Sequence, residues 1–170
     1  MEYQQDIDSL IEFILCHAED IRVCVEQKRE DDNGHGHTGG GTTGHMRVSD
    51  PTALKAIRAV EPIAYIHCPY GPAINNKRDE RYIPKPEKWL LVEAATRKRF
   101  YDDCADGVTK HIYRSRYLMG DYMENWRQTC MRHVPRISKG TYYTTRSSIL
   151  FYAHQYAYNI GLISPFGKLY

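Results

Sequence analysis

Apolar side chains recur at intervals of three and four residues through most of this 170-residue chain, the spacing that places them on one face of an α-helix. Between Ile63 and Ile83, prolines interrupt every alternation of apolar and polar residues, so nothing larger than a hairpin is predicted there. The length fits one compact domain with an extension, or two small helical units. The sequence therefore predicts an all-α fold.

The predicted order is a long N-terminal helix, a flexible Gly/His linker, central helices and a C-terminal helix-turn-helix. The expected bounds are 1–32 for an oligomerisation helix, 33–48 for the linker, 49–106 for the central helices, 107–163 for the helix-turn-helix and 164–170 for a tail.

The N-terminal helix is expected to run without a break from Tyr3 to about Lys28. Its apolar residues form a seam sustained over three heptads: Ile7, Leu10, Ile11, Ile14, Ala18, Ile21 and Val25. Such a seam needs a partner surface. That partner is either the same helix in a second subunit, which would make a homo-oligomer, or the rest of this chain, and the sequence favours neither.

Residues 31–48 are rich in glycine and nearly free of large apolar side chains, so we expect a flexible linker. His35, His37 and His45 suggest metal ligands, since imidazole is a common transition-metal ligand. However, glycine-rich backbone does not preorganise them. The five cysteines form no CxxC pair and are interpreted as small buried apolar residues. We therefore expect neither a metal nor another cofactor.

Two helices are expected in the central region. Asp50 caps the first, Pro51 occupies its first turn, and Pro62 ends or kinks it. The next segment, from Cys68 to Pro86, is expected to be an irregular loop. A second helix follows Pro86, and its expected apolar face comprises Trp89, Val92, Thr96, Phe100 and Cys104 or Ala105.

Three helical patterns follow Gly107. The face of the first comprises Val108, Ile112, Ser115 and Met119, and that of the second Tyr122, Met123, Trp126 and Cys130. Ser138 is placed to cap a long third helix, whose expected inner face comprises Tyr142, Thr145, Ile149, Tyr152 or Ala153, Tyr156 and Ile160. This order is typical of a unit that places its last helix in the major groove of DNA.

Charge is divided unevenly along the chain. Residues 1–32 contain ten Asp and Glu against three Lys and Arg, whereas residues 107–160 contain eight Lys and Arg against two acids. Two solvated helix faces would produce the same division, but a basic C-terminal segment also suits a polyanion such as double-stranded DNA.

The start of the third helix provides the candidate DNA-binding residues, which are Ser138, Lys139, Thr141, Tyr143, Thr144, Arg146 and Ser147. Hydroxyls at a helix N-terminus suit phosphate oxygens, Lys139 adds charge, and Arg146 can bind guanine or a phosphate. The alternative for the same pattern is a tyrosine-rich helical hairpin that binds protein.

The stretch from Ile137 to Ile163 resembles the C-terminal end of RinA-type and ArpU-type phage late-gene regulators, whose helix-turn-helix is similar to region 4 of bacterial sigma factors. The resemblance rests on Ser138, Lys139, Thr141, Tyr142, Tyr143 and the Gly161-Leu162-Ile163 ending, and it extends over residues 39–163. The glycines 39–41, SDPTA at 49–53 and the segment from Trp89 to TKHIYRSRYLMGD also fit. Thr144 and Thr145 replace the adjacent basic residues usual in sigma-like proteins.

The resemblance implies a sequence-specific activator of phage or prophage late genes, with host RNA polymerase as a further partner to consider. The alternative is a phage DNA-packaging protein similar to a small terminase subunit, which binds DNA as a ring oligomer.

An enzyme is not expected, since the chain has no phosphate-binding loop, GxSxG or HExxH. No run of 18 apolar residues exists and the N-terminus is acidic, so no membrane contact is expected and the bacterial host cytoplasm is the expected location.

Overall fold

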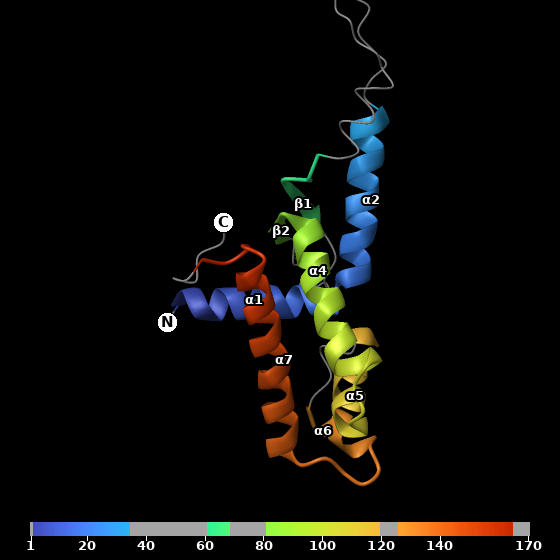
Figure 1. Ribbon diagram of the computed structural model, residues 1–170. Helices are drawn as coiled ribbons and strands as arrows, with labels where there is room; N and C mark the ends of the chain where they lie inside the picture. The colour runs from blue at the N-terminus through green and yellow to red at the C-terminus, as the bar shows by residue number, and fades with distance from the viewer. Residues whose placement is uncertain (1, 35–60, 69–80, 120–125, 165–170) are drawn as a thin grey trace, which may run out of the picture. The chain divides into compact units, whose positions relative to one another are not determined.

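The computed structural model describes residues 2–34, 61–68, 81–119 and 126–164. These residues are mostly helical, with one two-stranded sheet among them (Figure 1), so the helical class is confirmed. The linker histidines, the helix expected from Pro51 and the tail beyond Ser164 lie outside the described residues. Two compact units are present, one formed by residues 1–19 with 88–170 and the other by residues 20–87.

The prediction of one unbroken N-terminal helix is wrong, because the segment forms two helices. Helix α1 spans Glu2–Cys16 and helix α2 spans Ala18–Gly34. His17 lies between them, where its amide still donates to the carbonyl of Phe13 (2.9 Å) and its ring contacts the Phe13 ring (centroids 4.5 Å apart). The sequence has no glycine or proline here, so its local pattern contained no signal for the break.

The first part of the seam is buried within the chain. Ile7, Ile11 and Ile14 are at most 4% exposed, because α1 packs against α7 (Lys139–Asn159) and η2 (Arg114–Leu118). The sequence left open whether this part of the seam packs against a second subunit or against the rest of the chain. The structure shows that it packs against the rest of the chain. The seam of α1 therefore leaves no apolar stripe in water that would require a second subunit.

In the unit formed by residues 20–87, strand β1 (Tyr65–Cys68) pairs antiparallel with strand β2 (Arg81–Pro84). Among the described residues the sheet is no larger than the hairpin that the sequence allowed, but the irregular loop expected from Cys68 to Pro86 is wrong at Arg81–Pro84, which form β2. Ile66 and Ile83 face each other across the pair and are both buried. This buried cross-strand pair stabilises the hairpin beside the prolines.

Helix α4 (Pro86–Arg97) continues into the π-helical segment η1 (Lys98–Asp102). Trp89 and Thr96 are fully buried, as the spacing predicted. Phe100 is only partly buried and lies edge-on to Tyr152 of α7, with the ring centroids 5.7 Å apart. Phe100 therefore lies at the border between the core and the surface.

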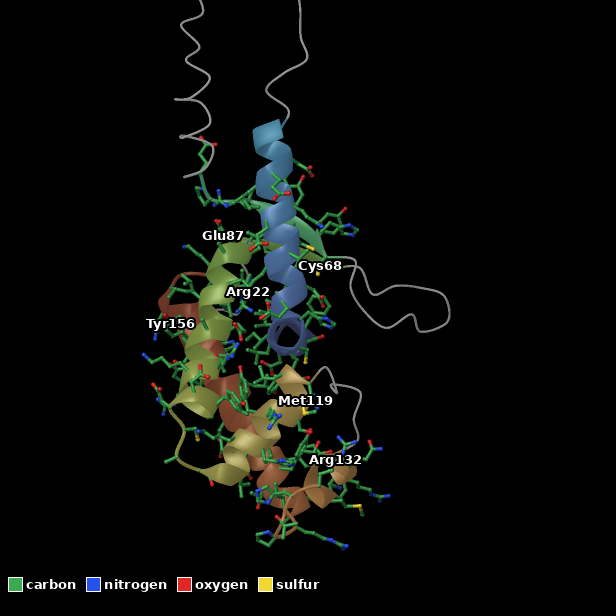
Figure 2. The ribbon with its side chains drawn as sticks, turned by 90° about the vertical axis from the view of Figure 1, so that its right-hand side faces the viewer. Arg22, Cys68, Glu87, Met119, Arg132 and Tyr156 are labelled. Carbon is green, nitrogen blue, oxygen red and sulfur yellow. The ribbon has the colours of Figure 1, made fainter. Side chains whose placement is uncertain are left out.

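Helix α5 (Gly107–Tyr113) is capped by Asp106, whose carboxylate accepts from the amides of Val108 and Thr109. It continues into η2, which ends at Leu118 with Met119 as the following cap residue. The expected inward position of Met119 is wrong, since this side chain is 55% exposed (labelled in Figure 2), and Tyr117 is buried in its place. The Met119 amide donates to the carbonyl of Arg114, five residues back, and this π-turn places Tyr117 and not Met119 on the buried face.

Two buried tyrosines provide a test of this packing. The Tyr142 hydroxyl accepts a hydrogen bond from Arg116 Nη1 (3.0 Å), whereas the Tyr117 hydroxyl has no hydrogen-bond partner among the described residues. We expect Tyr117→Phe to raise the free energy of unfolding by about 1 kcal/mol and Tyr142→Phe to lower it by a similar amount. Urea unfolding monitored by circular dichroism measures both, and equal effects of the two substitutions would contradict this assignment.

Candidate nucleic-acid interface

Three helices of the C-terminal region contact one another around a small core. They are α5, α6 (Trp126–Met131) and α7. The core contains one side chain from each helix and one from the connection before α7: Ile112, Cys130, Tyr142 and Ile137. Val108 and Trp126 pack at its edge, while Tyr122 and Met123 lie outside the described residues. This core fixes α7 against the two preceding helices.

Ser138 caps the N-terminus of α7, as predicted. The Ser138 hydroxyl oxygen accepts from the amide of Thr141 (3.0 Å) and also lies 2.8 Å from the Thr141 hydroxyl. Tyr142 is the first buried residue of the helix, followed by Ile149 and Ala153 on the same face. Tyr152, the alternative to Ala153, is only partly buried. The buried face thus determines which side of α7 points to solvent.

Six of the seven candidate residues lie on that solvent side. All of them are exposed: Ser138, Lys139, Thr141, Tyr143, Thr144 and Ser147. The structure therefore brings them together on the first two and a half turns of one helix.

Arg146 requires a correction, because its guanidinium is bound inside the protein. Its Nε donates to Glu12 Oε1 (2.8 Å) and its Nη2 lies 2.8 Å from Glu12 Oε2. Arg116 shares the same carboxylate, with its Nη2 2.6 Å from Oε1. Burial alone would raise the pKa of Glu12, but the hydrogen bonds and charges of the two arginines outweigh burial and lower that pKa. Arg146 thus holds α7 to α1.

Two aromatic rings flank Lys139, the other cation among the candidate residues. Lys139 Nζ lies 5.4 Å from the centroid of the Trp126 ring and 5.9 Å from that of Tyr143. Arg127 Cζ lies 5.6 Å from the same Trp126 ring. These distances are those of cation–π contacts. The tryptophan, which the sequence indicated only as part of a buried face, therefore also organises the cations beside α7.

Further cations surround this end of the helix. Arg132 and Arg136, in the connection between α6 and α7, are exposed, and Figure 2 labels Arg132 just after α6. Over residues 107–119 and 126–164 the sequence contains no Asp or Glu. The exposed face that includes Lys139 is therefore positive in the part of the region that the structure describes.

A groove of about 720 Å³ opens along the outer face of α7 and extends to η1. Tyr143, Thr144 and Ser147, three of the candidate residues, line it together with Arg99 and Phe100 of η1. Arg99 Cζ lies over the Tyr152 ring at 4.8 Å from its centroid. Sequence reasoning missed Arg99, because it precedes α7 by some forty residues and no local pattern links the two.

Within the described residues, no three His, Cys, Asp or Glu side chains gather as metal ligands. Asp102 pairs with Arg97 (3.7 Å), and Asp106 caps α5. His35, His37 and His45 lie outside the described residues. None of the described helices is both long and apolar enough to span a membrane.

Comparison of the chain with known protein families, with curated proteins and with solved structures found no match.

Proposed function

We propose that this protein is a sequence-specific DNA-binding transcriptional regulator, in which α5, α6 and α7 act as a helix-turn-helix and α7 is the recognition helix. The observation that supports this most directly is the start of α7, where a serine cap, exposed hydroxyls and Lys139 all lie open to solvent within the first two and a half turns. An activator of phage or prophage late genes is the specific role that the sequence resemblance suggests.

The chemistry of this face suits DNA. Hydroxyl groups and free amides at a helix N-terminus bind phosphate oxygens, and small polar side chains can approach base edges closely. The positive charge of the surrounding residues attracts a polyanion, and the described part of the region has no carboxylate to oppose it. The packing of α7 against α5 and α6 would hold the recognition helix in a fixed orientation.

The test begins with the full chain and a pool of random duplex DNA, from which bound sequences are selected and enriched. Enrichment of a common sequence would support the proposal. Binding without enrichment, or no binding at 50 mM salt, would overturn it.

Lys139→Gln provides the first prediction on the selected duplex. Because Lys139 is exposed at the start of α7, we expect it to contact a phosphate, so its loss should weaken binding to all duplexes by a similar factor. The slope of log K against log salt should fall in magnitude by about one. A salt-titrated shift assay measures both. Lys28→Gln, which removes an exposed lysine of α2, is the control that should bind as the parent does.

A further inference from the structure

Arg99 of η1 is oriented by aromatic rings. Its Cζ lies 4.8 Å from the Tyr152 centroid and 5.8 Å from that of Phe100, and these two rings contact each other. No carboxylate among the described residues pairs with Arg99, and its side chain is exposed at the groove. A guanidinium that is stacked but unneutralised is ready to bind an anion.

The floor of the groove is one solvent face of α7. Thr144, Ser148, Phe151 and Gln155 follow at offsets of 0, 4, 7 and 11, which is the spacing of one helical face. This face is about 16 Å long at 1.5 Å per residue, the length of roughly five base pairs. Helix α7 therefore presents a polar and aromatic surface well beyond its first turn.

The side chains of the groove favour DNA over a protein helix. Protein grooves that bind amphipathic helices present apolar pockets, whereas the apolar surface of this groove comes from aromatic rings and no Leu, Ile, Val or Met lines it. Glutamine can bind adenine in a bidentate manner, and phenylalanine can contact the methyl group of thymine. The only charged residue of the lining is a cation, Arg99, which is complementary to phosphate.

We propose that this groove is a second part of the DNA interface, resting on the proposed function above. One strand of the duplex runs along it, with a phosphate bound to Arg99. Phe151 and Gln155 face base edges in the major groove. Helix α7 then lies lengthwise in the major groove of the DNA and contacts base edges with its middle turns as well as with its N-terminus.

The test compares Arg99→Gln with Lys98→Gln in the full chain, using the duplex selected by the parent. Both variants lose one positive charge from η1, but only Arg99 lines the groove. We expect Arg99→Gln to weaken binding roughly tenfold and to reduce the magnitude of the salt slope by about one. Lys98→Gln should stay within twofold of the parent. In an ethylation-interference experiment, one phosphate whose ethylation weakens binding of the parent should no longer affect binding of Arg99→Gln. Lys98→Gln should show the same pattern as the parent.

A third variant tests the base contact. Gln155→Ala should relax the preference at one base pair of the selected site and leave the salt slope unchanged. If the parent selects a sequence and Lys139→Gln weakens binding, but Arg99→Gln and Gln155→Ala bind like the parent, the groove is not part of the interface while the proposed function stands. If the parent selects no sequence, the proposed function fails first.

Discussion

Replacing Glu12 by Gln should lower the free energy of unfolding at pH 7 by about 2–3 kcal/mol, although the substitution changes the shape of the side chain very little. Glu12 is the only carboxylate that the described structure places against both Arg116 and Arg146. The side chains of all three residues are no more than 30% exposed. Without the carboxylate, two guanidinium groups would remain partly buried, close together and without a counter-charge.

The effect should depend on pH in a defined direction. The pKa of Glu12 is lowered in the folded protein relative to its ordinary value of 4.5. A carboxyl group whose folded pKa is lowered stabilises the protein above its unfolded pKa, and this contribution is lost as the pH falls through the folded pKa. The difference in stability between parent and Glu12→Gln should therefore be constant above about pH 5 and should shrink below pH 4.5.

Glu26→Gln is the matched control, because Glu26 is exposed on α2 and should change stability by less than about 0.5 kcal/mol. Urea unfolding at several pH values, monitored by circular dichroism, measures both variants. If Glu12→Gln were as stable as the parent at pH 7, the carboxylate would not hold α1 to α7.

Replacing Ile149 by Ala should lower the free energy of unfolding by about 3–4 kcal/mol. Ile149 is fully buried in the middle of α7, on the face that also contains Tyr142 and Ala153. The substitution removes three buried carbon atoms and leaves a cavity that the closely packed interior fills only in part. Since this face orients α7, we also expect weaker DNA binding near the unfolding transition.

Phe151→Ala is the control from the same helix. Phenylalanine is larger than isoleucine, but Phe151 is 68% exposed, so its removal should cost less than about 1 kcal/mol. Denaturant unfolding of both variants gives the comparison. A larger loss for Phe151→Ala than for Ile149→Ala would mean that the outer face of α7 is buried in the folded protein, and it would contradict the open groove.

The helical parts of the chain could be predicted because their signals are local. The Ser138 cap and the start of α7 follow from side-chain chemistry within four residues. The burial of Trp89 and Ile149 follows from the three-to-four spacing of apolar residues. The exposure of Lys139 and Thr144 follows in turn, because buried positions on a regular helix fix the opposite face.

Other features depended on residues far apart in the sequence. The break at His17 and the exposure of Met119 could not be predicted, because no glycine or proline marks the first and the π-turn of η2 moved the second. Arg146 was assigned to DNA from its place near the start of α7, but Glu12, 134 residues away, binds its guanidinium. Helix periodicity gives the face of a charged side chain and does not identify its partner.

The sequence by itself determined the helical class, the start of α7 and the face of α7 that points to solvent, because capping and apolar periodicity act within a few residues. Only the tertiary structure decided which cations remain on the surface. Arg146 and Arg116 are both paired with Glu12, whereas Arg99 lies on aromatic rings beside the exposed face of α7. An ion pair depends on the distance between two charges in space, and that distance is set by how helices distant in sequence pack together.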